Sequence, residues 1–467
     1  MKLFSDFFRF IAIFIFLCGL SLTGCNDTAT RGGGNAPFVS SPVSTSPRPS
    51  TSPVQSGPIE SPLPVVASRP PPPTPERDVV VLKPPENMKH QVRVGLLLPL
   101  SGPRSAVGQK LLDAAILAVF DIADSHFVLV PIDTRSTPEG AVLAAEEAIA
   151  ADVKLVIGPV FSDAVEASAN TILDAGLSML VFSNDRAVAR TGIYLSGLLP
   201  ETQIDRIMRY AWQRGLQTIG ALVPPGPFGE RVSDALREAA AVGGIEITRI
   251  RKYGNTPESI ATAVKIITDY DDRRSALLEK RAELKKREDE GSQRALARLE
   301  VLETMGSVPF DALLVVASGD DLVNLAAQLG NYDIDTKRTR ILGTSDWAAE
   351  ETGREPSLVG AWFATPPVEA TTAFAAKYRK TYGTSPPPIT SSAYDLVSLA
   401  AILGSQTNGP RFDRKTLTSE TGFFGVGGLF RFRDDGLVER SLEVREVQAR
   451  GNRVIDAARK RFGNIAD

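Results

Sequence analysis

The sequence predicts a two-lobed α/β protein in which each lobe has a mostly parallel sheet with helices on both faces, preceded by a disordered proline-rich tether. Strand and helix patterns alternate in two series along most of the chain, which is typical of parallel sheets. The composition, 43% hydrophobic and 23% charged, allows sizeable cores. With 467 residues the chain is long enough for two or three folding units of roughly 150 residues.

Composition also excludes several functional classes. A net charge of -3 argues against a nucleic-acid partner, because phosphate binding needs clustered, uncompensated Lys and Arg. The two Cys (Cys18, Cys25) and two His (His90, His126) are too few for a structural zinc cluster and too widely spaced for a nucleophilic pair. No GxSxG elbow, P-loop or HExxH motif is present. We therefore expect a protein that is not an enzyme, without catalytic residues, metal or cofactor.

Residues 1–24 have the pattern of a lipoprotein signal peptide. Lys2 and Arg9 precede an apolar run over 10–20, which has the length of a signal-peptide core and is shorter than the roughly 20 residues that span a bilayer. The next residues, Leu22-Thr23-Gly24-Cys25, resemble a bacterial lipobox. The resemblance implies cleavage after Gly24 and lipidation of Cys25; an ordinary secretory signal with a chance Cys is the alternative.

Lipidation of Cys25 would fix the chain to a membrane, because two or more acyl chains give stable attachment. Asn26 is not the aspartate that retains lipoproteins in the inner membrane of enteric bacteria. The resemblance therefore favours the outer membrane, with the protein facing the periplasm.

The segment 25–90 is predicted to be a disordered linker. It is rich in Ser, Thr and Gly, and 15 of the 33 prolines lie between Pro37 and Pro85. Such a composition cannot bury enough apolar surface to offset chain entropy. In a polyproline II conformation of about 3.1 Å per residue, about 60 residues could reach on the order of 150 to 200 Å. We interpret the segment as a spacer; a PxxP docking ligand is the alternative.

The first α/β series begins with a buried strand at 92–99, which ends at Pro99 and a Ser101-Gly102 turn. A helix at 108–120 follows, with apolar residues at helical spacing. The series continues with strand 127–131, helix 138–151, strand 155–158, helix 164–175 and strand 178–183.

A second series predicts the other lobe. Its elements are helix 201–214, strand 218–223, helix 230–241, strand 245–249, helix 257–269, strand 312–316, helix 322–329 and strand 340–343. Ligands of such open sheets bind at the carboxyl ends of the strands, here between the lobes.

A charged insertion at 269–303 interrupts the second series. It holds nine Lys or Arg and ten Asp or Glu, a balance that excludes a nucleic-acid patch. A thin apolar stripe (Leu277, Leu284, Leu296, Leu299) and a helix break expected at Gly291-Ser292 predict a projecting helical hairpin. It is either a solvated decoration or a partner-docking element.

Several motifs together resemble the type I periplasmic binding proteins of the branched-chain amino-acid receptor group. They are Val94 to Gly102 with Gly108, Val156 to Ser162, Ala393-Tyr394-Asp395, and Gly428 to Phe432 with Asp435-Gly436. The resemblance covers about 92–447 and implies a binding-protein-like domain over 91–467. It places lobe 1 at about 91–197 and 346–420, and lobe 2 at about 198–345 and 421–450.

Within that superfamily, the lipobox, tether, insertion and Gly360-Ala361-Trp362-Phe363 resemble the penicillin-binding protein activator lipoproteins. This implies a non-enzymatic protein that docks from the outer membrane onto a bifunctional peptidoglycan synthase and stimulates it. The alternative is an ABC-transporter-type receptor for a small amino-acid-like ligand.

The receptor resemblance also implies candidate cleft residues. Ser162 matches the serine that holds the ligand carboxylate at a helix start, although a plain helix N-cap is an alternative role. Ser183 and Asp185 match the next contacts, and Asp346 lies near the position of the acid that receives the ammonium group. The full set is Ser101, Ser162, Ser183, Asp185, Phe228 and Asp346.

The aromatic residues of a receptor cleft are mostly missing. Receptors commonly have Tyr where this chain has Val107, and the position near Gly319-Asp320 also lacks an aromatic residue. Phe228 matches a Tyr position but has no hydroxyl. The pattern favours an altered cleft over an intact amino-acid site.

Overall fold

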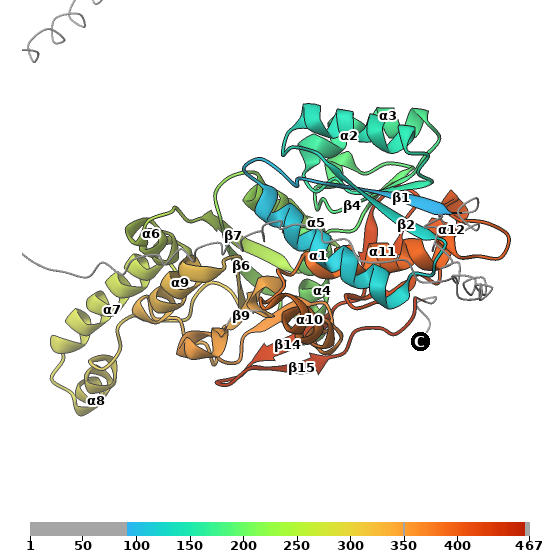
Figure 1. The fold of residues 1–467 in the computed structure, drawn as a ribbon. Helices are drawn as coiled ribbons and strands as arrows, with labels where there is room; N and C mark the ends of the chain where they lie inside the picture. The colour runs from blue at the N-terminus through green and yellow to red at the C-terminus, as the bar shows by residue number, and fades with distance from the viewer. Residues whose placement is uncertain (1–90, 349–350, 463–467) are drawn as a thin grey trace, which may run out of the picture. The chain divides into compact units, whose positions relative to one another are not determined.

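The computed structural model describes residues 91–348 and 351–462. The predicted signal peptide, the predicted lipidation site Cys25 and the predicted tether lie outside these residues. The described chain forms the two expected lobes, each built around a largely parallel sheet (Figure 1). Within the described ranges, no helix combines the length and apolar character needed to cross a membrane.

The first lobe contains a five-stranded parallel sheet in the order β2-β1-β3-β4-β5. Its strands are β1 (Val92–Leu98), β2 (Phe127–Asp133), β3 (Leu155–Ile157), β4 (Met179–Val181) and β5 (Ile193–Leu195). In the central strand β1, every residue except Arg93 is buried, as expected of a parallel strand covered on both faces.

Helices cover both faces of this sheet, with α2 and α3 on one side and α1 and α11 on the other (Figure 1). Gly108 allows α1 to lie close to the loop after β1, because a Cβ there would lie 2.0 Å from the Pro99 carbonyl oxygen. The helices of this lobe are α1 (Ser105–Ile122), α2 (Pro138–Ala150), α3 (Ser162–Asp174), α10 (Val368–Tyr382), α11 (Thr390–Gly404) and α12 (Arg414–Leu417).

The second lobe contains a seven-stranded sheet in the order β15-β14-β10-β9-β8-β6-β7. Only β14 and β15 run antiparallel to their neighbours. The strands are β6 (Thr218–Val223), β7 (Glu246–Lys252), β8 (Ala312–Val315), β9 (Arg340–Gly343), β10 (Trp362–Thr365), β14 (Glu443–Val447) and β15 (Asn452–Asp456).

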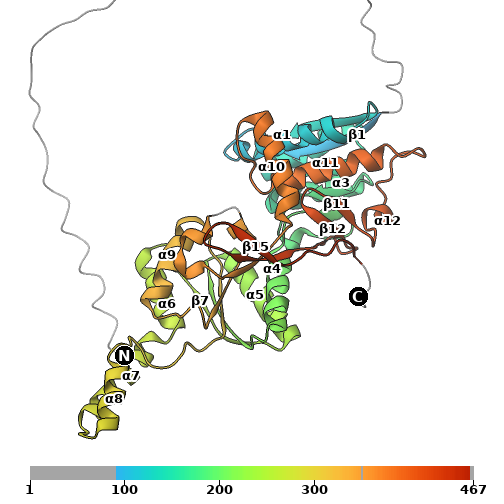
Figure 2. The same ribbon diagram turned by 90° about the horizontal axis from the view of Figure 1, so that it is seen from below.

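Figure 2 shows α4 and α5 on one face of this sheet and α6 and α9 on the other. Two separate apolar clusters, one under each helix pair, form the core of the lobe. The helices are α4 (Pro200–Gln213), α5 (Pro227–Gly243), α6 (Pro257–Ile267) and α9 (Gly319–Asn331). Short 3-10 turns lie at η2 (Arg186–Val188), η3 (Ser345–Ala348), η4 (Thr352–Arg354) and η5 (Pro356–Leu358).

The lobe boundaries predicted from the sequence are wrong after residue 345. Strand β10 belongs to the second lobe, because it pairs with β9 and β14. A three-stranded antiparallel sheet of β11 (Phe423–Gly425), β12 (Gly428–Phe432) and β13 (Val438–Arg440) packs into the core of the first lobe. The chain therefore passes between the lobes after β5, after β10 and after β13.

The insertion forms the predicted helical hairpin from α7 (Tyr270–Lys285) and α8 (Glu290–Leu299), which projects from the second lobe (Figure 1). The break lies before Glu290 and not at Gly291-Ser292. Asp289 is the N-cap of α8, and its carboxylate accepts hydrogen bonds from the Ser292 amide at 2.8 Å and hydroxyl at 2.6 Å. These bonds favour helix at the position where glycine suggested a break.

Candidate functional site

Ser162 is the first helical residue of α3, and Phe161 occupies the N-cap position. The alternative role of Ser162 as an N-cap is therefore wrong. The Ser162 hydroxyl makes no hydrogen bond with any described residue. Free N–H groups at a helix start favour an anion, but the Asp163 carboxylate already accepts from the Ala164 amide at 2.8 Å.

Arg104, which the sequence analysis did not identify, covers the same helix start. Its guanidinium lies 4.1 Å from the centroid of the Phe161 ring and 3.5 Å from Oδ2 of Asp163. Both charged groups beside Ser162 are thus paired with each other. A ligand carboxylate would have to displace Asp163 from Arg104 or share the cation with it.

Ser101 has a structural role in the loop after β1. Its hydroxyl donates to Oδ2 of Asp133 at 2.6 Å, and Oδ1 of Asp133 accepts from the Leu100 and Arg135 amides, each at 2.8 Å. Desolvation by itself raises the pKa of Asp133, but these hydrogen bonds outweigh it and hold the pKa below its ordinary value. The Ser101 hydroxyl is therefore committed to a carboxylate of its own lobe.

Ser183 and Asp185 lie together at the carboxyl end of β4. Ser183 is buried, and its hydroxyl accepts from the Asp185 amide at 3.1 Å. Oδ2 of Asp185 lies 3.9 Å from a guanidinium nitrogen of Arg231 on α5. Asp185 therefore faces a cation of the opposite lobe.

Arg231 is the second residue of the junction that sequence reasoning missed. It lies 5.9 Å from the ring centroid of Phe228, which is 37% exposed. Its Nε is buried without a hydrogen-bond partner. Only its position one turn after Phe228 could have drawn attention to it, because its ionic partner Asp185 is distant in the sequence.

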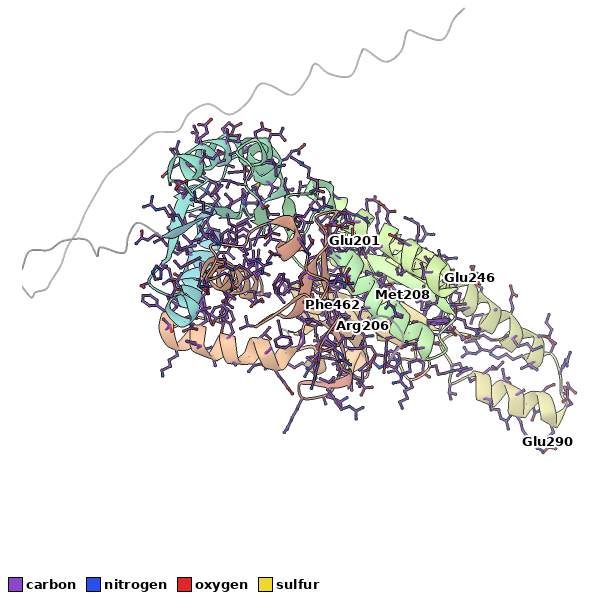
Figure 3. All side chains as sticks on the ribbon, turned by 90° about the vertical axis from the view of Figure 1, so that its right-hand side faces the viewer. Glu201, Arg206, Met208, Glu246, Glu290 and Phe462 are labelled. Atoms are coloured by element: carbon purple, nitrogen blue, oxygen red, sulfur yellow. The ribbon has the colours of Figure 1, made fainter. Side chains whose placement is uncertain are left out.

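A second charge pair crosses the junction beside the first. Arg186, the residue after Asp185, lies 3.8 Å from Oε1 of Glu201. Glu201 lies in the first turn of α4 and is labelled in Figure 3. Oε2 of Glu201 is buried and has no hydrogen-bond partner. Consecutive residues of one loop in the first lobe thus face opposite charges on two helices of the second lobe.

Asp346 stands apart from the other candidates. It is the second residue of η3, reaches solvent and forms no ion pair with a described residue. Desolvation by the surrounding protein raises its pKa above the ordinary value. A cation beside the Asp346 carboxylate would lower its pKa. The raised pKa therefore agrees with the absence of a cationic partner among the described residues.

Asp395, in a motif of the family resemblance, stabilises the turn between β11 and β12 in the first lobe. It is 4% exposed and accepts from the Val426 amide at 2.7 Å and the Gly427 amide at 2.9 Å. Desolvation raises its pKa to about 6, although nearby Arg440 and the two amides act in the opposite direction. Arg440 donates to the Ser196 carbonyl at 2.8 Å, which links the first and third passages of the chain.

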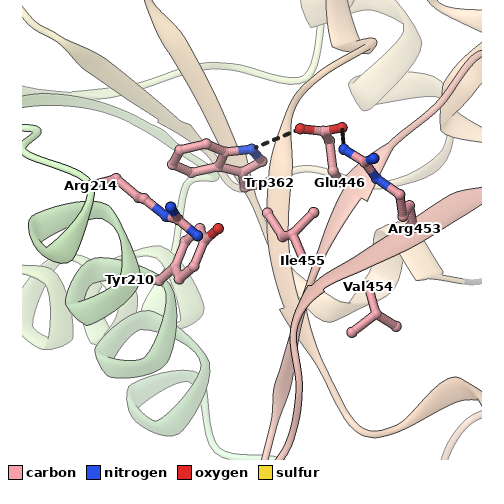
Figure 4. Close-up of a pocket in the computed structure, with 7 residues that line it drawn as sticks. All are labelled: Tyr210, Arg214, Trp362, Glu446, Arg453, Val454 and Ile455. Atoms are coloured by element: carbon pink, nitrogen blue, oxygen red, sulfur yellow. Dashed lines mark hydrogen bonds and ion pairs between the residues drawn. The ribbon is translucent and has the colours of Figure 1, made fainter.

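No candidate cleft residue lines either of two surface hollows formed by the described residues. One, here called the β15 hollow (Figure 4), measures about 440 Å³ and is lined by Tyr210, Arg214, Trp362, Glu446, Arg453, Val454 and Ile455. The other measures about 460 Å³ and is lined by residues 348, 351–354 and 449–452. The described side chains contain no group of three or more that could hold a metal ion.

Comparison with known proteins matches residues 91–272 to the sequence profile of a periplasmic binding protein family. An uncharacterized protein of Rickettsia prowazekii is 24% identical over 187 residues, which are 39% of this chain and 48% of that protein. The penicillin-binding protein activator LpoA of Photobacterium profundum is 28% identical over 151 residues, which are 31% of this chain and 24% of that protein. The matches thus span less than half the length of these relatives.

A solved structure, a putative branched-chain amino acid ABC transporter protein of Rhodospirillum rubrum, superposes with a TM-score of 0.60. It is 16% identical and covers 78% of this chain and 100% of that chain. Because it covers 78% of this chain, the likeness extends over both lobes. The chain is therefore a two-lobed protein with the type I periplasmic binding protein fold, similar to the branched-chain amino-acid-binding proteins.

Proposed function

We propose that this chain is a lipid-anchored, non-enzymatic activator of a peptidoglycan synthase, acting on the periplasmic side of the outer membrane. The observation that carries the proposal is the 151-residue match to a penicillin-binding protein activator. The lipobox at Cys25 and the proline-rich segment after it support the proposal, because together they would let an anchored domain reach across the periplasm.

The side chains at the lobe junction also support a role other than solute capture. Arg104 pairs with Asp163 beside Ser162, and Arg231 lies against Asp185 across the junction. Val107 is 37% exposed at the position where receptors commonly have Tyr. A ligand would therefore compete with ionic contacts that the protein already makes.

The experiment that tests the proposal uses the chain from Asn26 and a purified bifunctional synthase of the same organism. We expect saturable binding and an increased rate of glycan polymerisation or peptide cross-linking, with heat-unfolded chain as the control. If the folded chain neither binds nor stimulates any bifunctional synthase of that organism, the proposal fails.

Anchorage is tested separately in cells. Cys25→Ala removes the only thiol after the lipobox, so the variant should be uncleaved or soluble. Sucrose-gradient fractionation checks this outcome. A Cys25→Ala variant that is processed normally and stays with the outer membrane would contradict lipidation at this residue.

Solute binding is the second candidate function. It is favoured by the fold and by the unpaired polar atoms at the junction, the hydroxyl of Ser162, Nε of Arg231 and Oε2 of Glu201. Because the aromatic residues of the cleft are missing, we expect leucine-like amino acids to bind no tighter than millimolar, about -4 kcal/mol. Micromolar affinity for a common amino acid in titration calorimetry would instead support the receptor function.

A further inference from the structure

The β15 hollow has a rigid aromatic floor between α4 and the last strands of the second lobe (Figure 4). The rings of Tyr210 and Trp362 meet edge to face with centroids 5.1 Å apart. Tyr210 is only 3% exposed and Trp362 only 9%. These rings are too deeply buried to stack on a ligand, so the groups at the rim of the hollow provide its recognition chemistry.

A β-bulge determines which side chains of β15 reach that rim. Val444 pairs with Asp456 and Arg445 pairs with Val454, so Ile455 has no partner on β14. In a regular strand successive side chains point to opposite faces. At this bulge three successive residues, 453–455, line one hollow. A bulged edge also resists the addition of another strand, which favours recognition through side chains.

The rim carries an excess of positive charge. Two guanidiniums line the hollow, those of Arg214 and Arg453, against the single carboxylate of Glu446. Arg214 lies 4.8 Å from the Tyr210 ring centroid and forms no ion pair with a described residue. The full chain has a net charge of -3, so this cationic site differs from the average surface.

Glu446 neutralises Arg453 but leaves Arg214 without an ionic partner among the described residues. The Glu446 oxygens accept from Nε1 of Trp362 at 3.4 Å, Nε2 of Gln448 at 2.6 Å and a guanidinium nitrogen of Arg453 at 2.9 Å. Arg453 keeps further N–H donors free, and its side chain is 66% exposed. Figure 4 shows Arg214 and Arg453 on opposite sides of the hollow, with Ile455 between them.

The opposite edge of the same sheet also has an unpaired arginine, but neither surface hollow lies there. Along β7, Arg249 pairs with Asp269 at 2.5 Å and Lys252 pairs with Glu230, whereas the exposed Arg251 forms no ion pair with a described residue. Paired cations on a strand edge serve solubility and resist aggregation. The unpaired Arg214 beside a concave, partly apolar surface is better suited to a partner's carboxylate.

We propose that the β15 hollow is a docking site for an acidic segment of the synthase, with an Asp or Glu carboxylate bound between Arg214 and Arg453. An apolar side chain next to that carboxylate would cover Val454, which is 38% exposed. The inference rests on the proposed function, which supplies the partner. Charge pairs that lose water on docking contribute more than pairs that stay in solvent.

The test compares charge reversals at the two edges of the sheet. Arg214→Glu alters the hollow, and Arg251→Glu alters an exposed residue of β7 that forms no ion pair with a described residue. Binding of the chain from Asn26 to the immobilised synthase is measured at two salt concentrations. We expect the Kd to rise at least tenfold for Arg214→Glu, to change less than twofold for Arg251→Glu, and to depend less on salt in the Arg214 variant.

Each outcome distinguishes the two proposals. If the wild-type chain does not bind, the activator function itself fails. If the wild type binds and Arg214→Glu binds equally well, or both variants weaken equally, the docking site is overturned while the function stands. Should Arg214→Glu unfold, a photo-crosslinker at Val454 replaces it, and a crosslink to a synthase segment without Asp or Glu overturns the site.

Discussion

Arg440, at the third passage between the lobes, is buried close to a second charged residue, Asp395. Asp395 holds the turn between β11 and β12, and a Cβ on Gly425 would lie 2.2 Å from its Oδ1. Arg440, 8% exposed, ties the end of β13 to Ser196. Burial of an ionic group costs free energy unless its hydrogen bonds are satisfied. Asp395 and Arg440 therefore stabilise the fold only while these hydrogen bonds are made.

Asp395 should make stability depend on pH. Its pKa in the folded chain is about 6, above the ordinary 3.8, so folding favours the protonated form. The contribution of Asp395 to the free energy of unfolding is complete below pH 4 and is lost as the pH rises through 6. At about 1.4 kcal/mol for each unit of pKa shift, the loss is about 3 kcal/mol. Asp395→Asn cannot titrate and should be less stable than the wild type at pH 4, because one backbone N–H would lose its acceptor.

The measurement is the difference in Tm between wild type and Asp395→Asn from pH 4 to pH 7.5. We expect the wild-type advantage to be largest at pH 4 and to decrease toward neutral pH. A difference that stays constant across this range would show that Asp395 does not titrate there.

At the scale of elements, one buried arginine fixes the helical hairpin to the second lobe. The side chain of Arg273 is 10% exposed, donates to Oγ1 of Thr304 at 2.6 Å and lies 3.4 Å from Oδ2 of Asp333. Its neighbour Arg274 is largely exposed and makes only long contacts, the shortest at 3.4 Å to the Tyr270 hydroxyl. The two adjacent arginines form a matched pair of test positions.

Arg273→Ala should release the hairpin, because it leaves a buried hydroxyl and a carboxylate without their cation. We expect a loss of roughly 2 to 4 kcal/mol and faster proteolysis in the turn at 286–289. Arg274→Ala should change either quantity little. Limited proteolysis with mass mapping checks both variants, and equal cleavage rates would contradict the anchoring role.

The hairpin also allows a direct test of its predicted docking role. Replacing residues 270–305 by a short Gly/Ser linker removes α7 and α8 while β8 keeps its neighbours β6 and β9. Weaker synthase binding by this variant would support docking through the hairpin. Unchanged binding would identify the hairpin as a solvated decoration.

Local sequence patterns predicted the strands and helices of the two series, because buried parallel strands are short apolar runs and their helices have a 3.6-residue period. Strand β5 (Ile193–Leu195) was not predicted, although β3 and β4 are equally short. The role of β10 was not predictable either. Trp362 pairs with Leu342 on one side and Glu446 on the other, and no local pattern reports such distant partners.

Prediction of the candidate site had the same limit. Ser183 and Asp185 were expected to act together, and they do lie in contact. Arg104 and Arg231 were missed, because an isolated Arg in a loop or on a helix surface carries no signal of its partners. The ligand roles of Ser101, Ser162, Ser183, Asp185, Phe228 and Asp346 remain predictions.

At the scale of the whole molecule, reach should limit activity in cells. The predicted tether from Asn26 to Lys89 would set how far the folded domain extends from its anchor, and tethering raises the effective concentration at a partner within reach. Deleting about 40 of these residues should impair activation of the synthase in cells by reducing that reach. The same deletion should leave stimulation by the purified chain in solution unchanged, and loss of both activities would contradict a spacer role.

The three passages between the lobes also affect the order in which the chain can fold. Residues from β1 and from β13 share one core, and β14 completes the other sheet. If the chain is exported from its N-terminus, as the proposed signal peptide implies, neither lobe can finish folding until the last quarter of the chain has crossed the membrane. A nonsense mutation at about position 420 would therefore leave no intact half. The truncated chain would not fold and would be degraded by proteases, so no partly active protein would remain.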